Sequence, residues 1–392
     1  MEASNEKVNT TSPLNGIRVV EIGQLIAGPF AARVLADFGA DVIKIEAPQT
    51  GDALRSWRTM DGDTSIWWEV QSRNKKSVAL DLKSEQGQTA LKNLVAGADV
   101  LIENFKPGTL ERWGLGYEAL SNINPRLIML RVSGYGQTGP YADRPGFGVI
   151  GEAMGGLRYL TGEPGRKPVR VGFSLGDTLA ALHGVIGILL ALQERHQSGK
   201  GQEIDVSLYE SVFNCTESML TEYALTGELR EPAGSALPGI VPSDAYQASD
   251  GLVLIAGNGN GIFKRLMRCI GRLDLAQDPE LEDNQGRIRR VDEINAAIEQ
   301  WSRELSVDQV LQSLQACSVP AGRIYTARDI YLDPHYQARK MFVKTTTKAG
   351  HEYVQPGIVP KLGRTPGQIR TAAPRLGEHT TEVLQEIGLK RS

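Results

Sequence analysis

Short apolar runs alternate with helix-patterned segments through the first half of the chain. Residues 17–22 (IRVVEI) and 41–45 (DVIKI) have the β-branched composition of strands, and residues 29–38 between them have the period of a helix with proline in its first turn. Further strands are expected at residues 77–82, 99–102, 126–132 and 203–208, and a further helix at residues 84–95. Strands that alternate with helices predict βαβ units, and therefore an α/β fold with a parallel sheet.

The longest apolar segment, residues 172–197, predicts a long helix. Five aliphatic side chains recur in it at helical spacing, namely Leu179, Leu182, Ile186, Leu189 and Leu190. We expect this stripe to be the buried face. The apolar centre, residues 180–192, is shorter than the ~20 residues that a bilayer requires. Residues 1–12 lack the apolar region of a signal peptide, so we expect no membrane association and a cytoplasmic location.

The composition changes after about residue 225. Residues 231–242 are rich in proline, glycine and alanine, which is typical of a linker or a mobile loop. A strand is expected at residues 251–256, with helices at 263–270 and 291–305, so the pattern predicts a second, smaller domain. A further short helix is expected within residues 374–389, at the end of the chain.

Charge and cysteine content exclude several classes of protein. The 43 basic and 46 acidic residues nearly balance, which is not the pattern of a general nucleic-acid binder. Cys215, Cys269 and Cys317 have no CxxC spacing, so a disulfide framework and a zinc finger are not expected, and a reducing compartment is. The five histidines have no metal-ligand spacing, so we expect no metal site.

Two glycine-rich turns were considered as nucleotide or ligand loops. Residues 23–29 (GQLIAGP) follow the first expected strand but contain neither the GxGxxG of dinucleotide sites nor a P-loop, which disfavours a nicotinamide enzyme. Residues 257–261 (GNGNG) fit a strand-to-helix turn and a ligand loop about equally well.

Asp177 is the main candidate for catalysis. An aspartate at a helix start is most often an N-cap. A carboxylate is also ionised at neutral pH, so it can attack a thioester carbonyl without a general base. The basic cluster of residues 73–76, with Lys106, Arg112 and Arg131, could neutralise phosphates or form an ordinary solvated face.

Taken together, the segments resemble the class III CoA-transferase family, which includes formyl-CoA transferase and L-carnitine CoA-transferase. The matching stretches follow the order of the family along nearly the whole chain: residues 13–29, 39–52, 73–83, 99–112, 133–141, 176–205 and 376–380. The resemblance implies a Rossmann-like large domain built from both chain ends, with a smaller α+β domain inserted. It assigns residues 1–215 and 329–392 to the large domain and residues 216–328 to the small domain with its linkers. An interlocked, ring-like homodimer is also implied.

The resemblance makes Asp177 the nucleophile. It implies that Asp177 attacks the donor acyl-CoA to give an aspartyl mixed anhydride, that CoA then forms an aspartyl-CoA thioester, and that the acceptor carboxylate takes over the CoA. The acyl-CoA is a co-substrate, and no permanently bound cofactor is expected. Six positions match CoA contacts of the family, namely Ala27, Lys75, Asn104, Phe105, Arg112 and Tyr135.

Two departures from the family pattern bear on the substrate. Gln24 stands where formyl-CoA transferase has a histidine, and Ser133 replaces a lysine near the thiol end. Both disfavour an oxalate and formate specificity. On family precedent we expect succinyl-CoA as the donor and a small dicarboxylic acid as the acceptor. The family's mobile glycine loop maps to residues 234–239 or 257–261; the second assignment would bring Gly257 and Gly259 to the substrate.

Two other functions are compatible with this scaffold. The 2-methylacyl-CoA racemases pair the aspartate with a histidine in a GHD motif, but the corresponding residues 146–148 (GFG) offer no second proton acceptor. A non-catalytic CoA-binding protein would not require Asp177. We therefore expect a CoA-transferase, with racemase as the alternative.

Overall fold

The computed structural model describes residues 12–389. The chain divides into two compact units, and each is described here by itself. The first unit takes in the chain up to Arg158, Val171–Glu228 and the chain from Gln337 onward. The second unit consists of Tyr159–Arg170 and Leu229–Tyr336.

A six-stranded parallel sheet forms the centre of the first unit. Its strands are β1 (Arg18–Glu21), β2 (Asp41–Glu46), β5 (Lys75–Ala79), β6 (Val100–Glu103), β7 (Ile128–Ser133) and β8 (Glu203–Ser207). They lie in the order β5-β2-β1-β6-β7-β8, which is 3-2-1-4-5-6 when these six are counted along the chain. This is the order of the Rossmann fold. The predicted α/β fold with a parallel sheet is confirmed.

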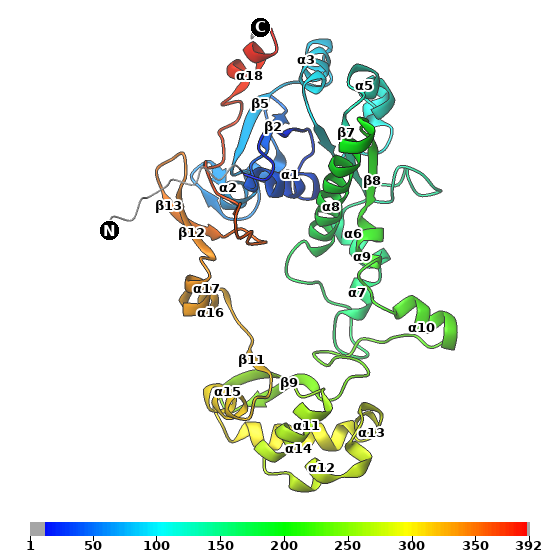
Figure 1. Cartoon of the computed structure of the whole chain (residues 1–392), viewed down its shortest axis with the longest axis vertical. Coiled ribbons are helices and arrows are strands. Elements are labelled where there is room, and N and C mark those ends of the chain that lie inside the picture. Colours follow the sequence, from blue (N-terminus) through cyan, green and yellow to red (C-terminus); the bar gives the residue numbers. More distant parts are fainter. Residues whose placement is uncertain (1–11, 390–392) are drawn as a thin grey trace. The chain divides into compact units, whose positions relative to one another are not determined.

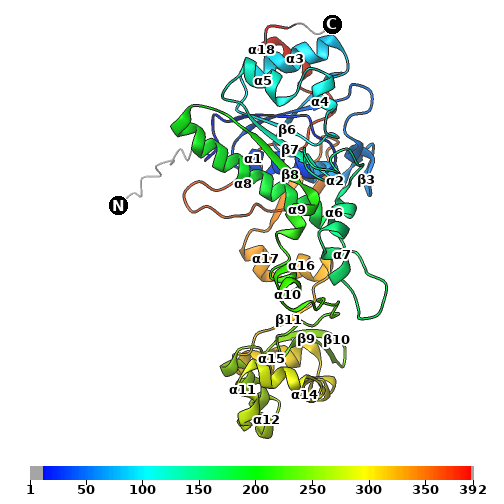
Figure 2. The ribbon, with the colours of Figure 1, turned by 90° about the vertical axis from the view of Figure 1, so that its right-hand side faces the viewer.

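Helices cover both faces of this sheet (Figures 1 and 2). One face packs against α1 (Ala27–Asp37) and α8 (Leu175–Ser198). The other packs against α3 (Glu85–Ala96), α5 (Tyr117–Ile123) and α18 (Thr380–Glu386). Neighbouring strand residues alternate between the two apolar clusters, as Val19 and Val20 do. Burial on both faces explains why these strands are nearly continuous apolar runs in the sequence.

The sequence predicted helix α8 but not its buried face. Its packed face consists largely of small residues, including Ala180, Ala181 and Gly184. A Cβ on Gly184 would lie 2.6 Å from Leu130 Cδ2, so the close approach of α8 to the sheet requires glycine there. The stripe expected to be buried is instead solvent-exposed in this chain, with Ile186 54% and Leu190 66% exposed. That prediction was wrong because both faces of the helix are apolar, and periodicity could not choose between them.

Helix α8 therefore carries a second apolar face that the described residues leave uncovered. Leu182, Ile186, Leu189 and Leu190 form this α8 stripe, and each is more than 40% exposed. By length and composition, α8 is the one helix in residues 12–389 that could cross a membrane. Its opposite face packs in the core of the first unit.

The second unit is built on a three-stranded antiparallel sheet in the order β11-β10-β9. Its strands are β9 (Ser243–Ala248), β10 (Gly251–Ala256) and β11 (Ala321–Arg323). Helices pack around an apolar core of this unit, namely α11 (Asn260–Cys269), α12 (Leu273–Gln277), α13 (Asn284–Arg289), α14 (Val291–Arg303) and α15 (Val307–Ala316). The predicted strand and both predicted helices are present. Residues 229–242, which include the expected linker, carry no helix or strand.

The C-terminal segment returns to the first unit and lies along strand β5. Ala79 donates its amide to Thr380 Oγ1 at 2.9 Å, and the His379 amide donates to the Ser77 carbonyl at 2.9 Å. These bonds cover the edge of the sheet, which would otherwise expose unpaired backbone groups. A hairpin of β12 (Phe342–Thr346) and β13 (Glu352–Pro356) precedes this segment.

The remaining elements are short. They are η1 (Ala53–Ser56), β3 (Met60–Asp61), β4 (Thr64–Ser65), α2 (Ile66–Gln71), α4 (Thr109–Arg112), α6 (Gly148–Met154), α7 (Leu157–Leu160), α9 (Leu208–Phe213), α10 (Met219–Thr226), η2 (Pro279–Leu281), α16 (Ala327–Leu332) and α17 (Pro334–Ala338).

Candidate active site

Four of the sequence-predicted site residues meet where the strand order of the parallel sheet reverses. Gln24 and Ala27 follow the carboxyl end of β1, while Asn104 and Phe105 follow the carboxyl end of β6, the strand beside it. The chain leaves these two strands in opposite directions, which opens a crevice at the sheet's edge. Ligands of open α/β sheets bind at such a point.

The Asn104 side chain joins the two strand ends. Its Oδ1 accepts from the Gln24 amide at 2.8 Å, and its Nδ2 donates to the Gln24 carbonyl at 2.8 Å. A Cβ at Gly23 would lie 2.9 Å from Asn104 Oδ1, so the turn requires glycine there. Asn104 thus fixes the turn after β1. The Gln24 side chain itself is exposed.

A buried network of four charged side chains lies beneath this turn. Lys44 Nζ lies 2.7 Å from Glu21 Oε1 and 2.9 Å from Asp52 Oδ2. Lys75 Nζ lies 2.7 Å from Glu21 Oε2. All four side chains are at most 1% exposed. Two carboxylates thus balance two ammonium groups, which is the condition for burying charge without a large penalty.

The network also holds the backbone of the turn. Lys44 donates to the Gly23 carbonyl and Lys75 to the Pro29 carbonyl, each at 2.8 Å. Asp52 accepts from the Leu25 amide at 3.1 Å. Leu25 has a φ of 65°, a left-handed conformation that costs free energy in a non-glycine residue. The ion pairs therefore stabilise an otherwise unfavourable turn between β1 and α1.

Burial and pairing shift the pKa values of this network in different directions. Burial dominates at Lys75 and lowers its pKa to about 8, although Glu21 opposes the shift. At Lys44 burial also favours the neutral form, but Glu21 and Asp52 together outweigh it and raise the pKa. The pKa of Asp52 stays below its usual value because Lys44 and the Leu54 amide outweigh the effect of burial.

Three of the six basic side chains in the cluster of residues 73–76, Lys106, Arg112 and Arg131 are buried in ion pairs and form neither a phosphate site nor a solvated face. Arg73 is buried and lies 2.6 Å from Asp37 Oδ2, and Arg131 is buried and lies 2.8 Å from Glu103 Oε1. The ammonium group of Lys75 is enclosed as described above. Lys106 and Arg112 are exposed. Arg112 ends α4, and its guanidinium donates to Thr109 Oγ1 at 3.1 Å.

Asp177 lies in the first turn of α8, where Ser174 is the N-cap residue. The N-cap interpretation of Asp177 is therefore wrong. Its carboxylate rests on the backbone of α6, because a Cβ on Gly148 would lie 2.0 Å from Asp177 Oδ2. Only glycine at residue 148 permits this contact. Asp177 is partly exposed, so a substrate can reach it.

Glu152, one turn further along α6, fixes the same helix start. It is 1% exposed, its Oε1 accepts from the Gly176 amide at 3.3 Å, and its Oε2 lies 3.3 Å from Arg158 Nη2. A Cβ on Gly176 would lie 3.0 Å from Glu152 Cγ. Amides at a helix start carry partial positive charge, which stabilises an ionised carboxylate such as that of Asp177.

Tyr135 extends the site toward strand β7. It follows the carboxyl end of β7, and its ring lies 6.0 Å from that of Tyr141 and 6.3 Å from that of Tyr209, between centroids. A Cβ on Gly146 would lie 3.4 Å from the Tyr135 ring and 2.8 Å from the Gly134 Cα. Gly146 directly precedes the segment that contacts Asp177. Tyr135 and Asp177 therefore lie in one cluster of loops. Ser133, the residue that ends β7, is buried and accepts from the Gly136 amide at 2.9 Å.

Gly257 and Gly259 belong to the second unit, whereas Asp177 belongs to the first. A Cβ on Gly257 would lie 2.6 Å from Leu266 Cδ2, which is a packing reason for glycine. Gly259 is the residue before α11. In the other candidate loop, Gly234 and Gly239 have φ angles of 64° and 72°, which favour glycine.

Sequence reasoning missed Glu21, Lys44, Asp52, Glu152 and Arg158. A signal existed for the first two, since each is a charged residue inside a predicted buried strand, where an unpaired charge is costly. Their partners come from elsewhere in the chain, so the sequence did not reveal the pairing. In residues 12–389, no group of three or more histidine, cysteine, aspartate or glutamate residues could hold a metal ion.

Known proteins are similar to this one along nearly the whole chain. The model of the family described as CoA-transferase family III matches residues 14–380. Succinyl-CoA–D-citramalate CoA-transferase of Chloroflexus aurantiacus is 45% identical over 377 residues, covering 96% of this chain and 94% of that protein. Succinate–glutarate CoA-transferase of Agrobacterium fabrum is 34% identical, covering 97% and 96%. The crystal structure of a CAIB/BAIF family protein from Brucella suis is similar with a TM-score of 0.84 and 35% identity, covering 96% of this chain and all of that one.

The lowered pKa of Lys75 predicts that the free energy of unfolding rises at alkaline pH. Between pH 8 and the ordinary lysine value of 10.5, the unfolded chain binds a proton that the folded chain has released. Folding is therefore favoured as pH rises through this window. From pH 8 to 10, the free energy of unfolding of the wild type should rise by about 2 kcal/mol relative to that of Lys75→Met. Urea denaturation at several pH values measures the free energy of unfolding of both proteins. A difference between wild type and Lys75→Met that does not change with pH would contradict the prediction. Lys83→Met, which replaces an exposed lysine, is the control.

Proposed function

The chain belongs to CoA-transferase family III, and from that premise we propose that it moves CoA from succinyl-CoA to a small free dicarboxylic acid. The observation that carries the proposal is the partly exposed Asp177 carboxylate, which lies in the first turn of α8 against the backbone of Gly148. The acyl-CoA is a co-substrate that is consumed and regenerated, so the transfer requires no ATP and no permanently bound cofactor.

Transfer begins when an Asp177 oxygen attacks the thioester carbonyl of succinyl-CoA. The C–S bond breaks, which gives an aspartyl succinyl anhydride and the CoA thiolate. The thiolate then attacks the aspartyl carbonyl, releases succinate and leaves an aspartyl-CoA thioester. The acceptor carboxylate attacks that thioester, and the same two steps in reverse produce the new acyl-CoA and free Asp177. Backbone amides of the glycine-rich loops beside Asp177 stabilise the oxyanions.

The CoA moiety spans the carboxyl edge of the sheet in this proposal. Ala27, Asn104 and Phe105 flank its nucleotide end near β1 and β6, and Arg112, an exposed cation at the end of α4, binds phosphate. Tyr135, beside β7, contacts the part nearer the thiol. Neighbouring strands are about 4.8 Å apart, so the route from β1 to the Asp177 region is on the order of 10–15 Å, a distance that the pantetheine arm can bridge.

Lys75 contributes to CoA binding through the turn rather than through phosphate. Its ammonium group is enclosed and already bonded to Glu21 and Pro29, and reaching a phosphate would leave Glu21 with one partner fewer. We therefore assign Lys75 a positioning role beneath the turn that carries Gln24 and Ala27.

The substrate assignment rests on the relatives and on two residues. The names of both transferases described above include a dicarboxylic acid and succinate or succinyl-CoA. Gln24 and Ser133 depart from the formyl-CoA transferase pattern. Racemase chemistry lacks comparable support, because residues 146–148, which lie beside Asp177, contain no group that could serve as a second base.

We further propose the architecture implied by the family resemblance. Residues 1–215 and 329–392 form the large domain, residues 216–328 form the small domain with its linkers, and two chains interlock as a homodimer in the cytoplasm. The α8 stripe supports the dimer, since four large aliphatic side chains on one helix face are left exposed in the single chain. An apolar face of this kind marks an interaction surface. Of the two candidate glycine loops, the first has left-handed backbone angles at Gly234 and Gly239, which favour glycine, whereas Gly257 and Gly259 have no such angles.

The substrate prediction is tested by mass spectrometry of CoA esters. The purified protein is incubated without ATP with succinyl-CoA and, in turn, citramalate, malate, glutarate, mesaconate, acetate and butyrate. We expect new CoA esters of one or more dicarboxylic acids and free succinate in equal amount. Transfer to the monocarboxylic acids alone would contradict the dicarboxylate assignment, and an unchanged CoA pool would contradict transfer from succinyl-CoA.

The nucleophile is tested with Asp177→Asn. The amide is nearly isosteric but cannot form the anhydride, so we expect transfer to fall by roughly three orders of magnitude or more while CoA still binds. Asp143→Asn, an exposed aspartate, is the matched control and should retain activity. Near-normal transfer by Asp177→Asn would show that the nucleophile is another group.

The dimer is tested at the α8 stripe. Leu190→Glu places a charge on the exposed apolar face, and because interlocked chains must associate as they fold, we expect less dimer and more monomer in sedimentation velocity of the refolded protein. Gln193→Glu introduces the same charge at an exposed position of the same helix and should leave the dimer intact. A wild-type monomer, or an unaffected Leu190→Glu dimer, would rule out this face as the dimer contact.

A further inference from the structure

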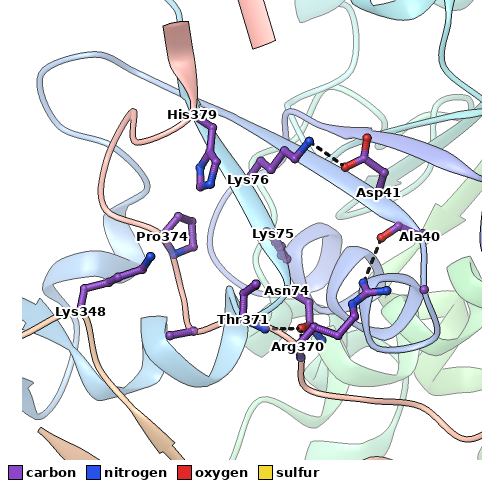
Figure 3. A pocket seen from close by; sticks show the side chains of 12 residues that line it. Ala40, Asp41, Asn74, Lys75, Lys76, Lys348, Arg370, Thr371, Pro374 and His379 are labelled. Atoms are coloured by element: carbon purple, nitrogen blue, oxygen red, sulfur yellow. Dashed lines mark hydrogen bonds and ion pairs between the residues drawn. The ribbon is translucent and has the colours of Figure 1, made fainter. Parts of the chain in front are cut away.

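A pocket lies at the amino-terminal edge of the parallel sheet, opposite the edge of the candidate active site. Figure 3 shows the side chains that line it. Its lining includes Asp41 and Lys76, at the amino ends of β2 and β5, and residues of the C-terminal segment such as Arg370 and His379. The volume is about 300 Å³, which is enough for a small ligand. Because all six strands are parallel, their amino ends lie at the edge away from the loops that carry Asn104 and Asp177.

The side chains that line this pocket are predominantly basic. Lys76, Lys348 and Arg370 line it together with a single carboxylate, that of Asp41. Lys75 is also part of the lining, but its ammonium group points into the buried network with Glu21. An anion is therefore the ligand that the lining favours.

Arg370 is the cation without a counter-ion. Its guanidinium donates to the Ala36 carbonyl at 2.8 Å. It also donates to the Ala40 carbonyl at 3.5 Å (Figure 3). Among residues 12–389, no carboxylate forms an ion pair with it. The backbone amides of Arg370 and Thr371 both donate to Asn74 Oδ1, at 2.6 and 3.1 Å, which fixes this stretch of chain at the pocket wall.

His379 supplies a neutral donor. Its Nδ1 accepts from the Ser77 amide at 3.2 Å, and only an unprotonated nitrogen can accept. The neutral ring therefore carries its proton on Nε2, for which the described residues show no acceptor. This leaves one N–H of a lining residue available to a ligand.

The two lysines are held more loosely. Lys76 Nζ lies 3.5 Å from Asp41 and 3.3 Å from Glu382, and Lys348 Nζ lies 2.7 Å from Glu378. Glu382 is 60% exposed and Lys348 is 41% exposed, so water screens these pairs. Solvent-exposed ion pairs contribute little, and an anion in the pocket can compete with them.

We propose that this pocket binds a small phosphate-bearing anion, at a site separate from that of the CoA thioester. A guanidinium without a counter-ion, two ammonium groups and a neutral N–H form a donor set that suits the several acceptor oxygens of a phosphate. The ligand would bond to the C-terminal segment, to the β12–β13 turn and to the sheet edge at once. It would therefore stabilise the folded chain in proportion to its occupancy.

The proposal is tested by isothermal titration of the full-length protein with pyrophosphate at fixed ionic strength. ADP and citrate serve as further probes. We expect saturable binding of pyrophosphate and weaker binding of citrate. Tighter binding of ADP than of pyrophosphate identifies a nucleotide as the source of the phosphate, and equal or weaker binding of ADP identifies a free inorganic anion. Absence of saturable binding of pyrophosphate and ADP, or tighter binding of citrate than of both, overturns the proposal.

Substitutions of lining residues test whether pyrophosphate binds in this pocket. Arg370→Gln should weaken pyrophosphate binding about tenfold, as expected for loss of a charge-assisted bond. Lys348→Gln, on the exposed rim, should weaken it as well and keeps the test valid if Arg370→Gln does not fold. Lys344→Gln, an exposed lysine of β12 that does not line the pocket, should leave binding unchanged.

One further variant separates this site from the CoA site. Arg112→Gln removes the exposed cation of the candidate CoA site and should leave pyrophosphate binding within about twofold of wild type. Loss of binding in Arg112→Gln with none in Arg370→Gln or Lys348→Gln would place the anion in the CoA site and overturn the proposal. The outcome does not depend on which acid the enzyme uses.

Discussion

The turn between β1 and α1 depends on one buried arrangement of charges. Glu21, Lys44, Asp52 and Lys75 are enclosed together, with two positive and two negative groups. Each costs several kcal/mol to remove from water, and only mutual pairing offsets that cost. Their remaining side-chain bonds go to the Gly23 and Pro29 carbonyls and to the Leu25 and Leu54 amides. The same network that satisfies the buried charges therefore fixes the crevice at which the strand order reverses.

Close backbone contacts hold the Asp177 carboxylate in position. Gly148 admits the carboxylate, Gly176 admits Glu152, and Gly146 lies against Gly134. A Cβ would clash at Gly148 and Gly146 and would crowd Glu152 at Gly176, so glycine permits the close approach of α6, α8 and the loop after β7. The result is a carboxylate that is partly open to substrate while the backbone around it is closely packed. The proposed role of Asp177 as the nucleophile depends on this combination, because a weak nucleophile must be held in a defined position.

Helix α8 takes part in both the candidate active site and the proposed contact between chains. Its first turn carries Asp177, its small-residue face packs on the sheet, and its large-residue stripe is left exposed. In the proposed dimer, the helix that presents the nucleophile would also form part of the contact between chains. The basic pocket lies at the other edge of the sheet, where the C-terminal segment covers β5.

The sequence by itself determined the alternation of strands and helices and the parallel sheet. Through resemblance it also predicted a site formed by Asp177 and the residues that follow β1, β6 and β7. These features depend on local periodicity and on the order of motifs along the chain. Tertiary structure decided which face of α8 is buried, because both faces are apolar and only the close approach to the sheet, at Leu130 and Ile204, selects the small residues. It also decided the roles of Arg73, Lys75 and Arg131, which the sequence alone could not distinguish from surface charges. Their partners Asp37, Glu21 and Glu103 are distant in the sequence, and only the folded chain brings them close enough to bury each pair.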